Sequence, residues 1–332
     1  MKDVSEEVDS RLYAIPALNT YDWGNFPAQA LGLFGDIHNR NASVALQLAR
    51  YFCNIEKQRL TKKATNGVEI SQPNGHLENS VLKIAKPFKL ELEEALGLRL
   101  CRWPGRAQIV PKGQNLTYFL DGAHTLLSIQ ACRTWFEYVS RLQEETIGPI
   151  KTMKVLIFNT TKDREPKALL SHFSSYPFDK IIFSTNLTQS HSIKDTDNTN
   201  HTTSRFAQSK RCEEHKQAWE EIQKEKCINT RNLESCNENI AYKQNDNGSQ
   251  IVPCCTAETI NEAIEYATNS LINIDDLSKK NTLVQVLVTG SIHLVGGVLQ
   301  IIDPKVLDRM ENEEDEKITK EYKQMATEQN TR

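Results

Sequence analysis

A four-residue stretch, DGAH, brings together an acid, a glycine and a histidine where an apolar run ends. Asp121, Gly122 and His124 follow the apolar residues 116–120. Glycine permits a tight turn, and a turn between a strand and a helix presents backbone amides and side chains to a ligand. An acid at that position can accept hydrogen bonds from ribose hydroxyls. Aspartate also caps helices well, so the spacing alone leaves nucleotide binding and capping open for Asp121.

A second stretch, CRWPGR, places an arginine at the end of a predicted turn. Pro104 and Gly105 favour the turn, and Arg106 follows them directly. The guanidinium group has a rigid fork of donors that suits a phosphate or a carboxylate. The alternative interpretation is a surface arginine stacked on Trp103.

A third stretch, VTGSIHLVGG, joins a predicted strand to a predicted helix. Gly290 and Ser291 form the turn, whose donors suit an anion. Gly296 and Gly297 lie inside the helix, where each costs roughly 1 kcal/mol relative to alanine, and this cost indicates close helix packing. His293 is more typical of a core or capping histidine than of a catalytic base.

The elements that must position these residues alternate between strand and helix. Apolar runs predict strands over 116–121, 153–159, 179–184 and 281–290. Helical spacing or charge patterning predicts helices over 124–143, 163–173, 204–226, 257–271 and 291–302. Parallel strands need right-handed crossovers, so the pattern predicts an α/β fold whose mostly parallel sheet is flanked by helices.

The remaining parts of the chain are more polar. A helix is predicted over 41–53 with Asn41 as its N-cap, and a short amphipathic helix over 86–106 that breaks at Gly97 and ends before Pro104. The Asn/Ser/Thr-rich residues 186–205 are expected to be a disordered insertion, and the tail from residue 308 a frayed, solvated helix or disordered.

Composition narrows the class of protein. The 332 residues predict one large or two modest domains, and no apolar run reaches the roughly 18 residues of a membrane span. The net charge of −3, with scattered Lys and Arg, argues against nucleic acid as a partner. The acidic start has no apolar run of the kind a secretory signal needs, and the eight cysteines show no CxxC pair or zinc spacing, so we expect a soluble intracellular protein with reduced thiols. Adjacent Cys254 and Cys255 are expected in a loop.

The three stretches occur in order, as WPGRAQ at 103–108, YFLDGAHTLLSIQACRTWF at 118–136 and VLVTGSIHLVGGVL at 286–299. Together they resemble the folylpolyglutamate synthases of eukaryotic type, within the Mur-ligase-like family. LGLFGDIHNRNASVALQLA and VLIFNTTKDREP extend the resemblance to most of residues 13–305. Thr125 stands where bacterial bifunctional relatives usually have Asn, which favours the eukaryotic type.

The resemblance implies an ATP-dependent ligase that adds L-glutamate to the γ-carboxyl of tetrahydrofolate polyglutamates through an acyl phosphate. By matching motif it implies that Arg106 contacts the ATP phosphates and Asp121 the ribose. His124 and Ser291 are implied more weakly at the glutamate and acyl-phosphate site. Asn41 is implied as a contact near the adenine, although Ile37 stands where relatives have His, and a plain helix N-cap is an equal alternative.

The resemblance also implies a domain organisation. Residues 1–102 resemble the end of an ATP-binding domain, 103–307 a complete C-terminal domain of the glutamate-binding type with a polar insertion at about 187–253, and 308–332 form a charged tail. The phosphate loop GxxxxGK[ST] is absent from the sequence. The ligands of Mg²⁺ are expected in a portion preceding Met1, so this polypeptide alone is predicted to be inactive or nearly so.

Three interpretations are compatible with the sequence. The chain is a fragment of an active synthase, a short non-catalytic binding or regulatory product, or part of another Mur-type amide ligase. The resemblance further implies a monomer of the cytosol, the mitochondrion or both.

Overall fold

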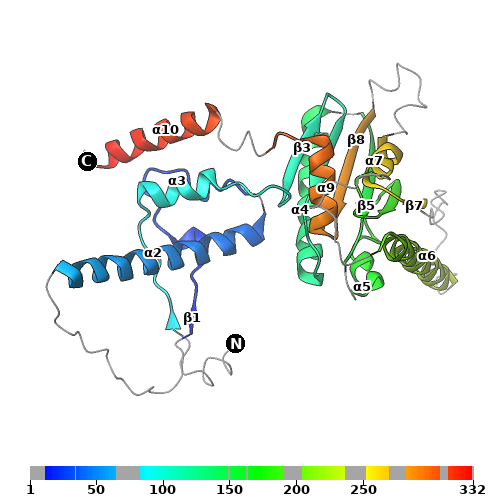
Figure 1. Cartoon of the computed structure of the whole chain (residues 1–332), viewed down its shortest axis with the longest axis horizontal. Coiled ribbons are helices and arrows are strands. Elements are labelled where there is room, and N and C mark those ends of the chain that lie inside the picture. Colours follow the sequence, from blue (N-terminus) through cyan, green and yellow to red (C-terminus); the bar gives the residue numbers. More distant parts are fainter. Residues whose placement is uncertain are drawn as a thin grey trace. The chain divides into compact units, whose positions relative to one another are not determined.

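The chain divides into two compact units. The computed structural model describes residues 12–33, 35–64, 83–148, 150–161, 164–189, 204–235, 252–268, 282–306 and 313–330. Unit 1 comprises Met1–Arg102 and Glu311–Arg332, and unit 2 comprises Trp103–Met310 (Figure 1). The boundary between them therefore falls directly before the WPGR stretch. No helix among these described residues is long and apolar enough to cross a membrane.

Unit 2 is built on a six-stranded sheet in its described residues. The strands lie in the order β3-β4-β8-β5-β6-β7 and are parallel except for β3, which pairs antiparallel with β4. Their bounds are β3 (Gln108–Lys112), β4 (Leu116–Leu120), β5 (Lys151–Phe158), β6 (Lys180–Ser184), β7 (Cys254–Ala257) and β8 (Thr282–Thr289). The predicted α/β fold with a mostly parallel sheet is confirmed.

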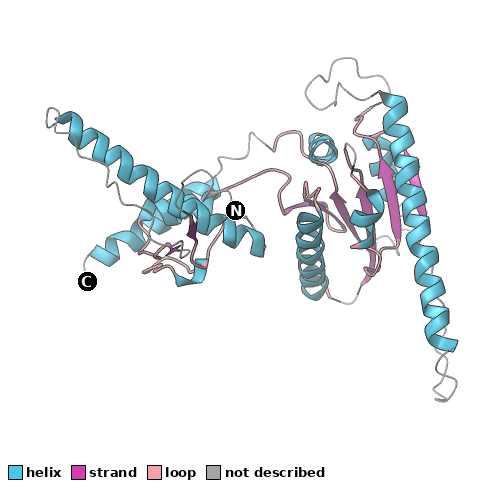
Figure 2. Cartoon of the chain, turned by 90° about the horizontal axis from the view of Figure 1, so that it is seen from below, coloured by secondary structure: helices cyan, strands magenta, loops and turns pink. Residues whose placement is uncertain are grey.

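Helices cover both faces of this sheet, as Figure 2 shows. One buried cluster joins the sheet to α4 (Leu126–Ile147), α5 (Pro166–Ser171) and α6 (Arg205–Ser235). The opposite cluster joins it to α7 (Ile260–Thr268) and α9 (Ile292–Ile302). Every residue of β8 is buried, as expected for a central strand with both faces covered.

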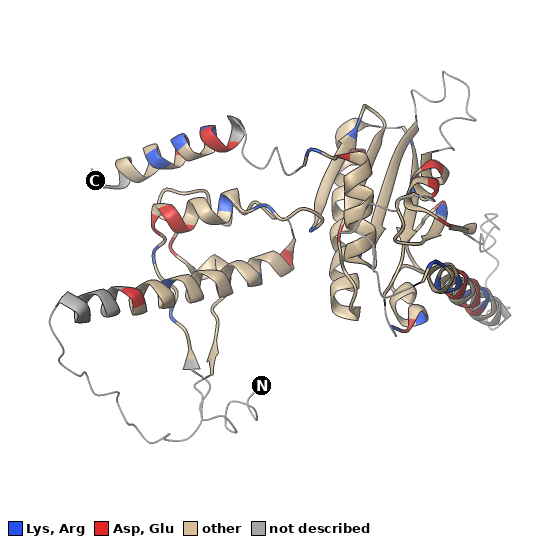
Figure 3. Ribbon diagram, viewed as in Figure 1, with Lys and Arg blue, Asp and Glu red and all other residues tan. Residues whose placement is uncertain are grey.

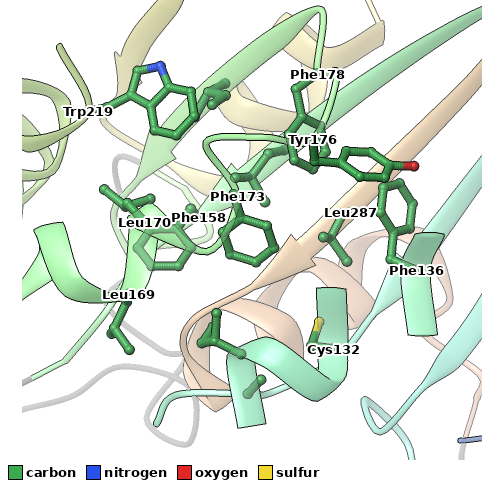
Figure 4. Packing of buried hydrophobic residues seen from close by; sticks show 14 of the residues in the cluster. Cys132, Phe136, Phe158, Leu169, Leu170, Phe173, Tyr176, Phe178, Trp219 and Leu287 are labelled. Carbon is green, nitrogen blue, oxygen red and sulfur yellow. The ribbon is translucent and has the colours of Figure 1, made fainter. Parts of the chain in front are cut away.

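The face that holds α4, α5 and α6 is rich in aromatic residues (Figure 4). Phe136 of α4 stacks on Phe178 with ring centroids 5.9 Å apart, and Phe158 of β5 meets Phe173 edge to face at 6.3 Å. Trp219 of α6 is 1% exposed in the same cluster. Aromatic pairs of this geometry add to the area they bury, so α6 is an integral layer of unit 2.

Two expectations for unit 2 are therefore wrong. The stretch 187–253 is not wholly a polar insertion, because α6 buries apolar residues at helical spacing under an otherwise charged surface: Cys212, Ala218, Trp219 and Ile222. Cys254 and Cys255 do not lie in a loop but in β7, which pairs with β6. Residues 190–203, most of the tract expected to be disordered, lie outside the described residues.

Unit 1 combines segments from both ends of the chain. Among its described residues, the helices are η1 (Leu18–Thr20), α2 (Asp36–Ala64), α3 (Leu92–Leu100) and α10 (Glu313–Asn330), and the short strands are β1 (Tyr13–Ala14) and β2 (Lys83–Ile84). Their shared core contains Leu18, Trp23, Phe26, Leu46, Leu90, Ala95, Ile318 and Tyr322.

Both predicted helices of residues 1–102 exist, but with different ends. Helix α2 begins at Asp36, directly after Gly35, which has a φ of +110°. Asn41 is thus an exposed residue inside the helix, and its predicted N-cap role is wrong. Helix α3 runs through Gly97, so the predicted break there is wrong. A capping box formed by Glu91 and Glu94 fixes the start of the helix. One glycine inside a helix costs only about 1 kcal/mol.

The charged tail is packed in unit 1, which corrects the expectation of a solvated or disordered segment. Helix α10 buries Ile318 and Tyr322, and the Tyr322 ring stacks on Phe26 with centroids 5.5 Å apart. Asp315 pairs with Arg102 at 3.2 Å. The four-residue spacing of the two buried side chains gives the helix one apolar face despite its many charges.

Candidate functional site

The turns after three neighbouring strands of unit 2 meet at one edge of the sheet. Because β4, β8 and β5 are parallel, Asp121, Gly290 and Asn159 all follow carboxyl ends of strands. The backbone amide of Asp121 donates to the Val288 carbonyl at 3.1 Å, and that of Asn159 to the Thr289 carbonyl at 3.3 Å. After β4 the chain enters α4 on one face, and after β8 it enters α9 on the other, an arrangement at which α/β proteins bind ligands.

Asp121 joins two backbone turns. Its Oδ1 accepts a hydrogen bond from the Ala123 amide and its Oδ2 one from the Ala107 amide, both at 2.9 Å. Ala107 has a φ of +42°, an uncommon conformation for a residue with a side chain. Bonds to an ionised acceptor are strong, so Asp121 fixes the turn after β4 and the turn before β3 as one structure.

The capping alternative for Asp121 is wrong. Helix α4 begins at Leu126, and Thr125 is its N-cap. The Thr125 hydroxyl accepts from the Ser128 amide at 3.2 Å, while the Ser128 hydroxyl accepts from the Thr125 amide at 2.9 Å. Because Thr125 and Ser128 form this capping box, the Asp121 carboxylate does not cap α4 and instead accepts hydrogen bonds from the two turns.

Gly122 is required for close approach. Its amide donates to the Gly105 carbonyl at 2.9 Å. A Cβ at Gly122 would lie 3.0 Å from the Arg106 Nη1 and 2.9 Å from the Ile292 Cγ1. The absent side chain therefore makes room for the Arg106 guanidinium beside the start of α9.

Arg106 is half-buried next to this turn. Its guanidinium carbon lies 5.7 Å from the centre of the Trp103 ring. Trp103 is 62% exposed, and the predicted stacking of arginine on tryptophan is present. No acidic side chain of the described residues forms an ion pair with Arg106. The Arg106 charge thus lies at the sheet edge, next to the turn that contains the Asp121 carboxylate.

His124 has a defined tautomer when neutral. Its Nδ1 lies 2.8 Å from the Gly122 carbonyl oxygen, which only accepts hydrogen bonds. The proton is therefore on Nδ1, and Nε2 of the neutral ring is an acceptor. The His124 amide donates to the Ser128 hydroxyl at 3.0 Å, which fixes the backbone beneath the ring.

Ser291 is buried and has a structural partner. It is the N-cap of α9, its hydroxyl accepts from the Leu294 amide at 3.4 Å, and the residue is 1% exposed. Gly290 before it has a φ of +96°, and a Cβ there would overlap the Asn159 carbonyl oxygen. The predicted close packing at Gly297 is confirmed, because its missing side chain makes room for Ile260 of α7.

A buried polar group at the ends of β5 and β6 was not predicted from the sequence. Asn159 Nδ2 donates to Asn186 Oδ1 at 3.1 Å, and Thr160 Oγ1 lies 2.8 Å from His215 Nε2. Burial, helped by the nearby Arg211, lowers the pKa of His215 to about 3, so the ring is neutral. The available signal was the polar runs NTT and STN directly after apolar strands.

Asn41 and the cysteines complete the list of candidates. Asn41 is exposed on α2 in unit 1. Burial raises the pKa of Cys212 to about 12 and that of Cys254 to about 11, so these thiols stay protonated at neutral pH. No group of three His, Cys, Asp or Glu side chains suited to a metal ion exists in the described part of the chain.

Comparison with known proteins finds relatives that are named folylpolyglutamate synthase. No family model matches the chain. Over 335 aligned residues it is 31% identical to the mitochondrial folylpolyglutamate synthase of Homo sapiens. The alignment covers 92% of this chain and 54% of the relative. The corresponding protein of Cricetulus griseus is 30% identical with the same coverage, and the folylpolyglutamate synthase of Saccharomyces cerevisiae is 27% identical over 91% of this chain and 44% of the relative. The chain therefore spans about half the length of these relatives.

Solved structures of bacterial proteins are also similar. A folylpolyglutamate synthase of Mycobacterium tuberculosis complexed with ADP and AMPPCP has a TM-score of 0.43 and 16% identity, covering 84% of this chain and 42% of that one. The folylpolyglutamate synthase of Thermotoga maritima has a TM-score of 0.40 and 17% identity, covering 93% of this chain and 52% of that one.

Proposed function

We propose that this chain is part of a folylpolyglutamate synthase, because it is 31% identical to the human relative over 92% of its own length. In this proposal the complete protein adds L-glutamate to the γ-carboxyl of tetrahydrofolate polyglutamates. ATP, when bound, would transfer its γ-phosphoryl group to the γ-carboxylate, which gives an acyl phosphate and releases ADP. The amine of glutamate then attacks the acyl carbon, an amide bond forms, and phosphate leaves. This chain contributes the residues at the carboxyl edge of the unit 2 sheet.

The observation that carries the proposal is the placement of Arg106. A carboxylate and a triphosphate repel each other until positive charge lies between them. Arg106 is held half-buried at the carboxyl edge of the sheet, in the space that Gly122 leaves, and forms no ion pair with a described residue. This position suits a guanidinium that binds ATP phosphates.

The other residues take supporting roles in the proposal. Asp121 contacts the ribose and fixes the turn from which Arg106 extends, a role supported by its bond to the Ala107 amide. His124 offers an acceptor at Nε2 to the glutamate amine. Ser291 binds substrate through the turn that it caps rather than through an exposed hydroxyl, because its side chain is buried. Asn41 is proposed as a contact to the adenine on the ground of the motif match alone.

The divalent metal and the phosphate loop are assigned to another part of the protein. The described residues contain no group of ligands that fits a metal ion, and the sequence contains no GxxxxGK[ST]. We therefore propose that the Mg²⁺ ligands lie in a segment outside these residues. The chain alone then binds nucleotide weakly and does not turn over.

Calorimetry with the ATP analogue AMPPNP tests the role of Arg106. We expect Arg106→Ala to weaken binding to the purified chain at least tenfold. Lys151→Ala is the matched control, because it removes one positive charge at the first residue of β5, on the opposite edge of the sheet. Equal binding by wild type and Arg106→Ala would remove the support for the proposal.

A second candidate function is a non-catalytic module that binds nucleotide or a partner. The observation that favours it is that the printed sequence contains no GxxxxGK[ST] phosphate loop. An assay of ATP- and glutamate-dependent folate elongation separates the two, since turnover by the purified chain excludes a purely binding role. A Mur-type ligase with another acceptor is distinguished by screening acceptors with the complete protein.

We further propose the cytoplasm, the mitochondrion or both as the compartment. The human and hamster relatives are named as mitochondrial proteins. We also propose that the functional protein is a monomer. Fractionation of cells and light scattering of the purified protein test these two statements.

A further inference from the structure

The outer edge of the unit 2 sheet has a hollow with a volume of about 470 Å³, which is in the size range of ligand pockets. Strand β7 lines it, and in the described structure β7 pairs only with β6, the strand on its inner side. Helix α6 borders the hollow on one face of the sheet through Lys216, and α7 borders it on the other through Tyr266. A strand edge with space beside it can accept a further strand from another polypeptide.

The backbone of β7 directs polar groups into the hollow. The Ile181 amide of β6 donates to the Pro253 carbonyl at 3.0 Å, so residue 253 faces β6. Along a strand of a parallel sheet, the N–H and C=O groups of successive residues point alternately to the two sides. The backbone groups of Cys254 and Thr256 therefore point away from β6, toward the hollow that both residues line. They offer an added strand two donors and two acceptors.

One lysine lies on each side of this strand edge. Lys180 is on the α7 side, where its Nζ donates to the Tyr266 carbonyl at 2.9 Å and lies 5.5 Å from the centre of the Tyr266 ring. Lys216 extends from α6 on the opposite side, and its side chain is 31% exposed. Strand β7 has no charged residue, whereas α6 carries both signs of charge, as Figure 3 shows. The Cys254 and Cys255 thiols add no negative charge at neutral pH, because burial raises the pKa of both.

Carboxylates of the two neighbouring helices also lie near the hollow. Glu213 is 3.6 Å from Lys216, an ion-pair distance longer than a hydrogen bond. The Glu262 carboxylate of α7 accepts hydrogen bonds from the Tyr266 hydroxyl and from a backbone amide. Glu220 is exposed on α6, where solvent screens its charge. The two lysines therefore keep positive charge available to an anionic group that enters between them.

We propose that the β7 edge binds an extended acidic peptide of a partner protein, which pairs with β7 as an added strand and places two successive carboxylates on the two lysines. Successive side chains of a strand point to opposite faces, so neighbouring acidic residues reach Lys180 on one face and Lys216 on the other. Two carboxylates separated by one residue share a face and meet only one lysine. Lys180 is the first residue of β6, so this site lies at the amino end of that strand, away from the carboxyl edge of the sheet.

Fluorescence polarisation with labelled peptides tests the proposal on the purified full chain. The probe is STVEEVTS, with an amidated C-terminus and two successive acidic residues. The first control peptide, STVQQVTS, keeps the shape and lacks the charges. The second, STEVEVTS, has the same composition but places both acidic side chains on one face of the strand. The three peptides separate pairing by the backbone from recognition of the charge pattern.

Two variants of the chain test the two parts of the site separately. Thr256→Pro removes a backbone N–H that points into the hollow and leaves the side of β7 that pairs with β6 unchanged. Lys216→Gln removes the positive charge on the α6 side. Lys210→Gln is the matched control, because it removes a lysine of the same helix that is 68% exposed and also lies near a glutamate. Circular dichroism and thermal unfolding check that the variants are folded.

We expect the wild type to bind STVEEVTS at least about fivefold more tightly than either control peptide. Thr256→Pro should weaken this binding at least about tenfold and Lys216→Gln about threefold to fivefold, with Lys210→Gln within about twofold of wild type. Equal binding of the three peptides, or no binding of any, would overturn the proposal. If Thr256→Pro does not fold, equal binding by Lys216→Gln and Lys210→Gln overturns it. A wild-type homodimer that Thr256→Pro dissociates would overturn it in favour of edge pairing between two copies.

Discussion

At the scale of single residues, the Asp121 carboxylate is as much a structural element as a ligand candidate. It accepts from the amides of Ala107 and Ala123, and Ala107 is held at a positive φ. An effect of its removal on nucleotide binding therefore includes a change in the position of Arg106. Stability has to be measured beside binding for any Asp121 variant.

Asp121→Asn should destabilise unit 2 by about 2 kcal/mol, because an amide replaces one charged acceptor by a donor that faces a backbone N–H. Thermal unfolding followed by circular dichroism measures the change. Glu145→Gln is the control, since it neutralises an exposed carboxylate on α4. An unchanged melting temperature for Asp121→Asn would show that the two amide bonds contribute nothing to stability.

His215 gives unit 2 a predictable dependence on pH. Its folded pKa of about 3 lies below the ordinary value of 6.5, so the unfolded state binds a proton that the folded state refuses. This difference in pKa has no effect on the free energy of unfolding above pH 6.5. As the pH falls from 6.5 towards 3, it lowers that free energy by up to about 1.4 kcal/mol per pH unit. We expect His215→Gln to flatten the fall in free energy of unfolding between pH 7 and pH 5.

Denaturant unfolding at several pH values measures this slope. His172→Gln is the comparison, because His172 lies outside the buried polar group of Asn159, Thr160, Asn186 and His215. The interpretation fails if wild type and His215→Gln lose stability in parallel over this range.

The residue types in the sequence predicted at which strand ends polar side chains would lie, but they did not predict the hydrogen-bond partners of those side chains. Asp121 and Ser291 were expected at strand ends and lie there. The bond from Ala107 to Asp121 joins residues 14 apart through the pairing of β3 with β4, and no local pattern contains that information. For the same reason His215, which meets Thr160 across 55 residues, was not predicted.

At the scale of elements, the strands and helices that were predicted correctly are those with long, continuous or strongly periodic apolar patterns. The four predicted strands and five predicted helices of unit 2 all exist, because buried parallel strands and long amphipathic helices carry strong periodic signals. In the described part of unit 2, the strands that were not predicted are β3 and β7, which lie at the two edges of the sheet. Strand β3 contains Pro111, which weakens a strand pattern, and β7 has only four residues.

The turn from β8 to α9 is an element-scale feature that tolerates no side chain at its first residue. Gly290→Ala should destabilise unit 2 by at least about 2 kcal/mol, because it combines a φ of +96° with overlap on the Asn159 carbonyl and the Phe158 ring. Gly113→Ala is the control, with a φ of +71° and no atom within 4 Å of the added Cβ. Chemical denaturation should show a markedly larger loss at Gly290, and equal losses would mean that the overlap relaxes at no cost.

At the scale of the whole molecule, the two ends of the chain form one unit. The expectation of a solvated tail was wrong because the tail packs against residues that are very distant in sequence. Phe26 and Tyr322 stack although nearly the whole chain separates them, and the local signal, two apolar residues four apart in a charged segment, is weak. The boundary before Trp103 and the return of the chain after unit 2 make unit 1 discontinuous.

Tyr322 tests this organisation through two substitutions of one residue. Tyr322→Ala removes a side chain that is 3% exposed and stacked on Phe26, so it should destabilise unit 1 by about 3–4 kcal/mol. Tyr322→Phe should be neutral or slightly stabilising, because the buried hydroxyl has no hydrogen-bond partner among the described residues and its removal leaves the stacked ring in place. Hydrogen exchange read by mass spectrometry measures both effects by segment.

For Tyr322→Ala, we expect faster exchange in residues 18–26 and in α3, and unchanged exchange in β5 and β8 of unit 2. Faster exchange throughout the chain would mean that the two units unfold as one cooperative structure. Unchanged exchange everywhere would mean that α10 contributes nothing to unit 1, and the discontinuous unit would then be wrong. A loss confined to unit 1 would show that the tail belongs to the same folding unit as residues 12–102, so removing it would expose the core around Leu18 and Phe26 rather than trim a disordered end.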